Sequence, residues 1–288
     1  MKKAILLNII LFIIIILNFG CGGLIDTYYM ETEPTTIGIK DENTLILRVF
    51  YRFSQNQKGW MFDAPKELNS FYYLLEKDIN QDKQWIKGEK NLGGNIGIIY
   101  HNDIIGLGNI GLGDYSFVKF LNSNTYQIIK SVNFSIGTFH DFTNDSKKIL
   151  FNYFKFSEYN CDNGLSTQLL PYDVLDAKYC PINENFLAYI GETITANNIS
   201  GDLYTMNNDG TNINTVLAGY NVIKICWKPD GKTIVFLNNN GIWNINDDGS
   251  GLIKILDFNL PTKYKSIALY YNLIAYIDED GKVVSVKF

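Results

Sequence analysis

The sequence is poor in side chains that metal and carboxylate sites commonly use. It has two histidines, His101 and His140, and two arginines, Arg48 and Arg52, in 288 residues. The histidines are not at a metal-binding spacing, and we expect each to be a surface or turn residue. Lys and Arg number 25 against 30 Asp and Glu, a net charge of −5. This balance lacks the basic footprint of a nucleic-acid-binding protein and excludes a nucleic-acid partner.

Long hydrophobic runs are absent except at the N-terminus. There, Met1-Lys2-Lys3 precedes an apolar run from Ala4 to Leu17 that only Asn8 interrupts. The run has about 14 residues, whereas a membrane-spanning helix needs roughly 20. The pattern therefore favours a signal peptide over a permanent transmembrane anchor, and we expect the signal peptide to be residues 1–20.

The run ends at Gly20-Cys21-Gly22, which resembles the lipobox of bacterial lipoproteins, although Asn18 stands where that family usually has an aliphatic residue. The resemblance implies that Cys21 is acylated and becomes the new N-terminus. The alternative is an ordinary signal peptide with an incidental cysteine. Two or three acyl chains hold a protein on a bilayer far better than one. We therefore expect a membrane-anchored protein of the cell envelope, at the periplasmic face or the outer membrane. Residues 21–43 would be its lipidated N-terminus and tether.

Cysteine is also scarce. Acylation of Cys21 would leave Cys161, Cys180 and Cys226. An odd number cannot form a complete disulfide framework, so free thiols are expected. A single bridge, such as one between Cys161 and Cys180, remains open in an oxidising compartment.

Helical patterns are nearly absent after residue 43. The one candidate, Lys66–Lys77, has its apolar residues in a continuous cluster that also suits a strand. Elsewhere, short runs of Ile, Val, Leu, Phe and Tyr alternate with Asn, Asp, Gly and Lys, which is typical of strands and turns. Aromatic residues, 14% of the chain, favour the half-buried surfaces of sheets. These patterns predict an all-β protein.

An internal repeat distinguishes between the all-β folds. Trp227-Lys228-Pro229-Asp230-Gly231 leads into a strand, and Phe142-Thr143-Asn144-Asp145-Ser146 has the same form. Weaker copies start at Tyr100, Cys180 and Ile267. Neighbouring copies lie about 40 residues apart, the length of one four-stranded propeller blade. Counting back one period from Tyr100 predicts a further copy in the segment Lys58–Phe62.

Asp-Gly turns separate the strands of the repeat. Glycine supplies a positive φ, and the aspartate bonds to the local backbone. Such turns recur at two phases of one period, which indicates two hairpins per blade. The predicted turn residues of the repeat are Asp145, Asp209, Gly210, Asp230, Gly231, Asp248 and Gly249.

These units resemble the TolB-like β-propeller repeat. The resemblance lies in the Pro-Asp-Gly unit at Trp227–Gly231 and in Tyr204-Thr205-Met206 and Trp243-Asn244-Ile245, each followed by an Asp-Gly turn. It implies a propeller fold and is not specific for function, because the repeated residues are turn and core residues. We expect an envelope protein as a partner, although the partner role known in that family does not simply carry across.

The number of repeats predicts one β-propeller of about six four-stranded blades over residues 44–288. The strand Thr44–Tyr51 lies outside the regular count. We expect it to pair beside Val283–Phe288, so that the N- and C-terminal strands close the ring and protect the sheet edges.

No motif in the chain points to catalytic, cofactor-binding or metal-binding residues. The string Gly106–Gly111 has the GxGxxG pattern, but no helix pattern follows it, so we interpret it as a loop between strands. Asn244–Gly249 resembles the start of a calcium loop, but Ile255 stands where the loop needs glutamate, which indicates an ordinary β-turn. Two arginines in one strand cannot form the three-arginine clamp of sialidases.

The sequence therefore predicts an envelope lipoprotein whose propeller is a non-catalytic scaffold for binding a protein or ligand. The alternative is an envelope glycan-active enzyme, a lyase or hydrolase, with carboxylates and tyrosines at the central channel. Carboxylates or tyrosines with perturbed pKa values at the channel would favour the enzyme.

Overall fold

The computed structural model describes residues 27–58, 63–80, 84–86, 96–109, 117–133, 137–195 and 198–288. The chain divides into two compact units, one of residues 1–30 with 52–69 and the other of residues 31–51 with 70–288. In the first unit, the described residues are end segments of three long strands. Within the described ranges no helix is long and apolar enough to cross a membrane.

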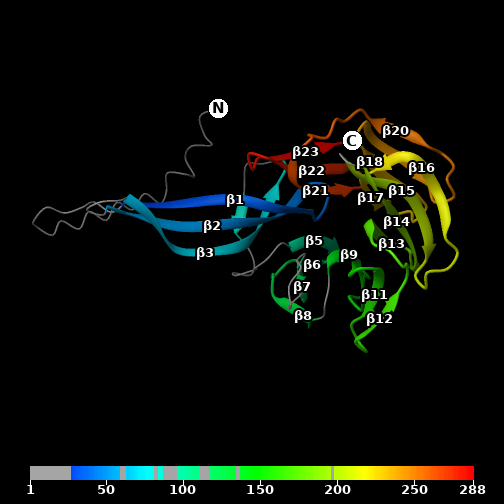
Figure 1. The fold of residues 1–288 in the computed structure, drawn as a ribbon, viewed down its shortest axis with the longest axis horizontal. Helices are drawn as coiled ribbons and strands as arrows, with labels where there is room; N and C mark the ends of the chain where they lie inside the picture. The colour runs from blue at the N-terminus through cyan, green and yellow to red at the C-terminus, as the bar shows by residue number, and fades with distance from the viewer. Residues whose placement is uncertain are drawn as a thin grey trace, which may run out of the picture. The chain divides into compact units, whose positions relative to one another are not determined.

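The strands form a six-bladed β-propeller whose antiparallel sheets follow one another in chain order (Figure 1), and the second unit contains all of it except the end segments of the first three strands. Blade 1 contains β1 (Thr27–Ile39), β2 (Thr44–Lys58), β3 (Asp63–Asp78) and β4 (Gln84–Ile86), blade 2 contains β5 (Ile96–His101), β6 (Ile104–Asn109), β7 (Phe117–Asn122) and β8 (Ile128–Asn133), and blade 3 contains β9 (Thr138–Phe142), β10 (Lys148–Asn152), β11 (Phe156–Asn160) and β12 (Leu165–Gln168).

The last three blades complete the ring. Blade 4 contains β13 (Val174–Cys180), β14 (Asn183–Thr195), β15 (Asn198–Asn207) and β16 (Asn214–Val222), blade 5 contains β17 (Lys224–Trp227), β18 (Thr233–Asn238), β19 (Gly241–Asn246) and β20 (Ile253–Leu256), and blade 6 contains β21 (Tyr264–Tyr270), β22 (Leu273–Asp278) and β23 (Val283–Lys287). The first strand of each blade is innermost, and β9, β13, β17 and β21 contact one another in succession.

Burial explains why these strands are continuous apolar runs. In β18 the side chains of Ile234, Val235, Phe236 and Leu237 are all buried. Ile234 and Phe236 pack toward blade 4, whereas Val235 and Leu237 pack toward blade 6. A middle strand of a blade has a neighbouring blade on each face, so both sets of alternating side chains are apolar. The outermost strand β12 has no such cover and is exposed throughout.

The predicted all-β, six-bladed propeller is confirmed. The ambiguous segment Lys66–Lys77 lies within strand β3. Three repeat positions, Phe142, Cys180 and Trp227, end the innermost strands of their blades. The copy expected at Lys58–Phe62 falls largely outside the described residues.

The boundary between tether and propeller was predicted too late in the chain. Strand β1 occupies Thr27–Ile39, within the segment expected to be a tether. Ile37 and Ile39 are buried in the core between blades 1 and 6. Their alternation is short and follows a threonine-rich stretch with Pro34, so it did not stand out as a strand pattern.

The predicted closure of the ring by strand pairing was wrong. Strand β2, which includes Thr44–Tyr51, lies between β1 and β3, and β23 ends a three-stranded sheet. Because β1 takes the innermost position, β2 already has a partner on each side. The ring closes by side-chain packing instead, with Leu45 and Leu47 against Leu273 and Ala275.

The glycine string was also misinterpreted as a loop. Gly106 and Gly108 lie in strand β6, while Gly111 is outside the described residues. A Cβ atom on Gly108 would lie 2.4 Å from Phe139 Cγ, and one on Gly106 would lie 2.6 Å from Phe142 Cε1. The two glycines therefore make room for aromatic rings of blade 3.

Candidate functional site

The innermost strands bring charged side chains together at the centre of the propeller. Strand β5 carries His101, β9 carries Asp141, β13 carries Asp176 and Lys178, and β17 carries Lys224. We call these five residues the axial cluster. Ion pairs join His101 to Asp141, and Lys178 and Lys224 to Asp176. The charge of Lys178 also acts on Asp141, so the interactions run from blade 2 to blade 5.

Asp141 joins three blades through its two carboxylate oxygens. Oδ1 lies 2.7 Å from Nε2 of His101 in blade 2, and Oδ2 accepts the backbone N–H of Tyr179 in blade 4 at 2.8 Å. Burial alone raises the pKa of the Asp141 carboxyl. The charges of His101 and Lys178 and these hydrogen bonds outweigh burial, so the pKa lies below its usual value.

Asp176 occupies a similar position one blade further on. Its Oδ2 accepts the backbone N–H of Ile225 in blade 5 at 3.3 Å and lies 3.5 Å from Lys224 Nζ. Burial raises the pKa of this carboxyl, but the charges of Lys224 and Lys178 outweigh it and hold the pKa below its usual value.

Lys178 lies between the two carboxylates. Its Nζ donates to the carbonyl oxygen of His140 at 2.6 Å and lies 3.7 Å from Asp176 Oδ1. Burial would lower the pKa of Lys178, but Asp176 and Asp141 outweigh this effect and raise it. The ammonium group is therefore charged at neutral pH.

The carboxylates of the axial cluster and its nitrogen-bearing side chains differ in their access to solvent. The side chains of Asp141 and Asp176 are 0% and 3% exposed, whereas those of His101, Lys178 and Lys224 are 30%, 21% and 32% exposed. The carboxylates are thus enclosed and hold backbone and cations, while the groups that reach solvent are hydrogen-bond donors. Such a surface can receive an anionic group.

The same geometry is poorly suited to acid catalysis on glycans. A glycosidase acid is a carboxyl whose pKa is raised, so that it carries a proton at working pH. Asp141 and Asp176 have lowered pKa values. The raised pKa of Lys178 makes it an equally poor general base.

Further polar groups adjoin the axial cluster. Burial raises the pKa of the Cys226 thiol on β17 to about 12, although the Lys178 charge acts against this rise. It also raises the pKa of Tyr270, at the end of β21, to about 12, and the nearby Tyr271, Cys226 and Asp41 add to that rise.

Both histidines were expected at the surface or in turns, and for His140 this was wrong. His140 lies in strand β9 and is buried, whereas His101 ends strand β5 and is part-exposed. Burial lowers the pKa of His140 to about 4, and the Lys178 and Lys224 charges act in the same direction against Asp176. The ring is therefore neutral at pH 7.

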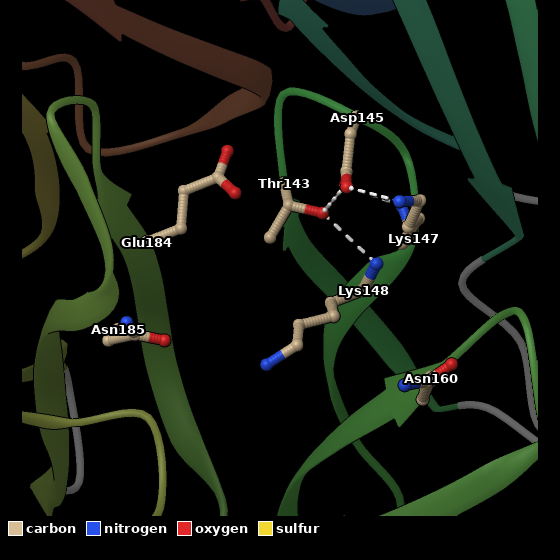
Figure 2. A pocket seen from close by; sticks show the side chains of 7 residues that line it. All are labelled: Thr143, Asp145, Lys147, Lys148, Asn160, Glu184 and Asn185. Atoms are coloured by element: carbon tan, nitrogen blue, oxygen red, sulfur yellow. Dashed lines mark hydrogen bonds and ion pairs between the residues drawn. The ribbon is translucent and has the colours of Figure 1, made fainter.

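A polar depression of about 130 Å³ lies between blades 3 and 4 (Figure 2). Its polar groups bond to one another. Thr143 Oγ1 donates to Asp145 Oδ1 at 2.8 Å, the Asn144 N–H donates to Glu184 Oε1 at 2.6 Å, and Lys148 Nζ pairs with Glu158 at 3.0 Å. Ligand pockets usually enclose roughly 300 Å³ or more. This depression is therefore a turn surface, and we do not assign it a ligand.

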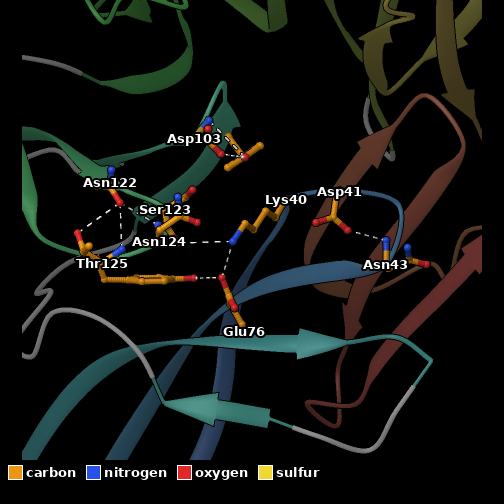
Figure 3. Close-up of polar contacts among 11 residues, drawn as sticks. Lys40, Asp41, Asn43, Glu76, Asp103, Asn122, Ser123, Asn124 and Thr125 are labelled. Carbon is orange, nitrogen blue, oxygen red and sulfur yellow. Dashed lines mark hydrogen bonds and ion pairs between the residues drawn. The ribbon is translucent and has the colours of Figure 1, made fainter.

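A second polar cluster joins blades 1 and 2 (Figure 3). Lys40 Nζ lies 2.8 Å from Glu76 Oε1, which also accepts the hydroxyl of Tyr126 at 2.6 Å. Burial raises the pKa of Tyr126, and Glu76 adds to the rise. The three side chains tie neighbouring blades together.

The predicted turn residues lie in turns between strands. Gly210, Gly231 and Gly249 have φ values of 80°, 64° and 85°. An Oδ1 atom of each predicted aspartate accepts the backbone N–H two residues on, at 3.0 Å in Asp145, 2.9 Å in Asp209, 2.8 Å in Asp230 and 2.9 Å in Asp248. None of these residues belongs to the axial cluster. Cys21 lies outside the described residues.

The bridge left open between Cys161 and Cys180 does not form. Cys161, Cys180 and Cys226 are all free. Among the residues with described side chains, no three His, Cys, Asp or Glu residues gather in a metal-binding group.

Sequence reasoning missed the axial cluster. Its members are single charged residues within otherwise apolar innermost strands, such as Asp176 and Lys178 in VLDAKYC. The available signal was a charged residue inside an apolar strand, one or two residues before a repeat position. Asp141 and Lys178, each shortly before a repeat position, carried that signal.

The sequence matches no protein-family model and no curated protein. The fold is similar to that of a chain of the mitotic checkpoint complex, with a TM-score of 0.53 and 13% identity over 90% of this chain and 93% of that chain. It is also similar to a chain of hydrazine synthase from Kuenenia stuttgartiensis, with a TM-score of 0.52 and 12% identity over 89% of this chain and 96% of that chain. The chain has a β-propeller fold. At these identities the likeness shows the fold alone.

Proposed function

We propose that the protein is a cell-envelope lipoprotein, anchored through acylated Cys21, whose propeller is a non-catalytic binding scaffold. The axial cluster is the binding site, and its ligand is an anionic group, a carboxylate or phosphate, on a small molecule or a protein partner. The solvent access of the cluster carries this proposal, because the ammonium groups of Lys178 and Lys224 reach solvent while its carboxylates are enclosed.

The alternative glycan-active enzyme has less support. Perturbed carboxyl pKa values were the sign expected of the enzyme, but those of Asp141 and Asp176 are lowered, so neither carboxyl carries a proton near pH 7, and the raised pKa of Lys178 leaves no neutral amine there. Rigid inter-blade bonds to Tyr179 and Ile225 also fix the two carboxylates in place.

The anchor is tested by feeding producing cells an alkyne fatty acid and comparing the wild type with Cys21→Ser. We expect the wild type to incorporate the label and sediment with membranes, and Cys21→Ser to lose the label. An unlabelled wild type, or equal labelling of both proteins, would contradict acylation at Cys21.

The binding site is tested by titrating the purified full chain with citrate, galacturonate and inorganic phosphate in a calorimeter. Lys224→Met removes a part-exposed ammonium and leaves Lys178 beside Asp176. We expect it to weaken binding at least ~10-fold, as expected for a charge-assisted hydrogen bond.

Lys130→Met is the matched control. Lys130 has a similarly exposed side chain, 31%, and pairs with Asp162 away from the axis. It should bind like the wild type. No binding of any of the three anions, or equal losses in both variants, would refute the axial site.

A further inference from the structure

In the part of the chain that the structure describes, blade 6 has one strand fewer than the other blades. Blades 1 to 5 each contain four strands, whereas blade 6 contains only β21, β22 and β23. The fourth strands of the other blades are β4, β8, β12, β16 and β20, of 3, 6, 4, 9 and 4 residues. No described residue occupies the corresponding position beside β23.

The hydrogen bonds of β23 show which backbone groups face this vacant position. The Phe288 N–H donates to Asn272 O, and the Asp278 N–H donates to Lys282 O. In an antiparallel pair, alternate residues point to the same side, so the even-numbered residues from 282 to 288 face β22. The backbone N–H and C=O groups of Val283, Ser285 and Lys287 therefore point outward from the sheet.

The apolar side chains around this edge are only partly covered. Val286 and Phe288 pack toward blade 5 beside Phe258, whereas Val283 packs toward blade 1. None of the five residues of β23 is buried. A fourth strand would cover these side chains and pair the outward backbone groups.

The vacancy favours a single peptide segment over a second propeller. Strands in a sheet lie about 4.8 Å apart, so the edge of blade 6 is set back by about that distance from the outer edges of four-stranded blades 5 and 1. A lone extended strand fits such a recess. The flanking blades of a second copy, itself recessed at the same edge, would meet before the two β23 strands came within pairing distance.

We propose that β23 is a β-augmentation site, at which a partner protein inserts an extended segment as the missing fourth strand of blade 6. The segment runs antiparallel to β23, contains no proline at the paired positions, and has apolar side chains in alternation. Three outward residues provide its main-chain bonds, and the half-covered valines provide apolar contact. This site is separate from the axial cluster and does not depend on its function.

The test uses four fluorescently labelled peptides that copy the described fourth strands Ile128–Asn133, Leu165–Gln168, Asn214–Val222 and Ile253–Leu256, each with two flanking residues. Anisotropy measures their binding to the full chain in detergent, and hydrogen exchange follows the amides of β23. We expect at least one peptide to bind and to slow exchange at Val283, Ser285 and Lys287, while the inward-facing Val284 and Val286 change little.

Ser285→Pro removes an outward N–H, and proline is tolerated on the open side of an edge strand. It should weaken peptide binding at least ~10-fold, whereas the matched control Ser285→Ala, which keeps the N–H, should bind within about twofold of the wild type. Circular dichroism and thermal unfolding establish that both variants are folded.

Three results would overturn the proposal. One is a failed binding test, in which no peptide slows exchange at the three outward amides or the peptides bind Ser285→Pro as well as the wild type. Another is that these amides are already protected in a monomer, so that the chain covers its own edge. The third is a dimer in sedimentation that Ser285→Pro dissociates, which would assign the edge to a second copy.

Discussion

The Asp141 carboxylate in blade 3 accepts the backbone N–H of Tyr179 in blade 4 at 2.8 Å. The same relationship recurs elsewhere in the ring. Asp176 accepts the N–H of Ile225 in the next blade, and Ser266 Oγ of blade 6 accepts the N–H of Ile37 in blade 1 at 3.2 Å. Side-chain oxygens of innermost strands thus bond to the following blade at three junctions, including the one that closes the ring.

Asp141→Ala is expected to lower the free energy of unfolding by about 3 kcal/mol or more. Removing one partner of a buried charge pair leaves the others without compensation, at a cost of roughly 3–5 kcal/mol. Here the N–H of Tyr179 and Nε2 of His101 lose their hydrogen-bond partner. Chemical denaturation at pH 7 measures the change.

Asp141→Asn is the matched control for this effect. Its amide oxygen can still accept the N–H of Tyr179, so it should cost less than Asp141→Ala. Equal losses in the two variants would show that the charge, and not the inter-blade bond, accounts for the effect. A loss below about 1 kcal/mol in Asp141→Ala, typical of surface substitutions, would contradict the role assigned to Asp141.

Buried His140 should make stability depend on pH between about 4 and 6.5. Its pKa falls from 6.5 to about 4 on folding, so in this window the unfolded chain binds a proton that the folded chain does not. Stability is then full above pH 6.5 and decreases as the pH falls toward 4, by at most about 3 kcal/mol. Denaturation at a series of pH values measures the slope.

His140→Phe should remove most of that slope, because phenylalanine is apolar and does not titrate. Below pH 4 both proteins should lose further stability as Asp141 and Asp176, whose pKa values are lowered on folding, take up protons. An unchanged slope in His140→Phe would show that another group causes the pH dependence.

Ser146→Gly should raise the free energy of unfolding by about 1 kcal/mol. Ser146 has a φ of 57°, a left-handed conformation that costs a non-glycine residue about 1 kcal/mol or more. Its Oγ is buried and has no hydrogen-bond partner among the described residues. Glycine relieves both conditions, and thermal unfolding measures the gain.

Gly231 occupies in blade 5 the turn position that Ser146 occupies in blade 3, so replacing this glycine tests the same conformation in the opposite direction. Gly231 has a φ of 64°, and a Cβ atom there would lie 2.2 Å from Ile182 Cγ1. Gly231→Ala should therefore destabilise the protein by about 1 kcal/mol or more. Stabilisation by Gly231→Ala, or destabilisation by Ser146→Gly, would contradict the assigned turn geometry.

Three cysteines should react as free thiols when the purified protein is unfolded without reductant. Burial raises the pKa of Cys161 to about 11 and that of Cys226 to about 12, so both thiols are protonated at pH 7 and should react slowly in the folded protein. Mass spectrometry after alkylation counts the additions. A melting temperature that falls on adding reductant would indicate a disulfide.

The repeat made the fold predictable, because it recurs in the turns and strand ends that define a blade. Trp227-Lys228-Pro229-Asp230-Gly231 places an aromatic residue, a turn and a strand in a fixed order, and each of these is a local property of the chain. Strand β1 was missed because its apolar pattern is only Ile37 and Ile39, and the partners that bury them, Leu273 and Ala275, lie more than 230 residues away.

By itself, the sequence determined the all-β class, the period of about one blade per 40 residues and the turns, because these depend on neighbouring residues. Only the tertiary structure decided that Asp141, Asp176 and Lys178 meet at the axis and that the described residues give blade 6 three strands instead of four. Both features depend on which strand occupies the innermost place in each blade. That arrangement arises when six sheets, apolar on both faces, pack against one another around a closed ring.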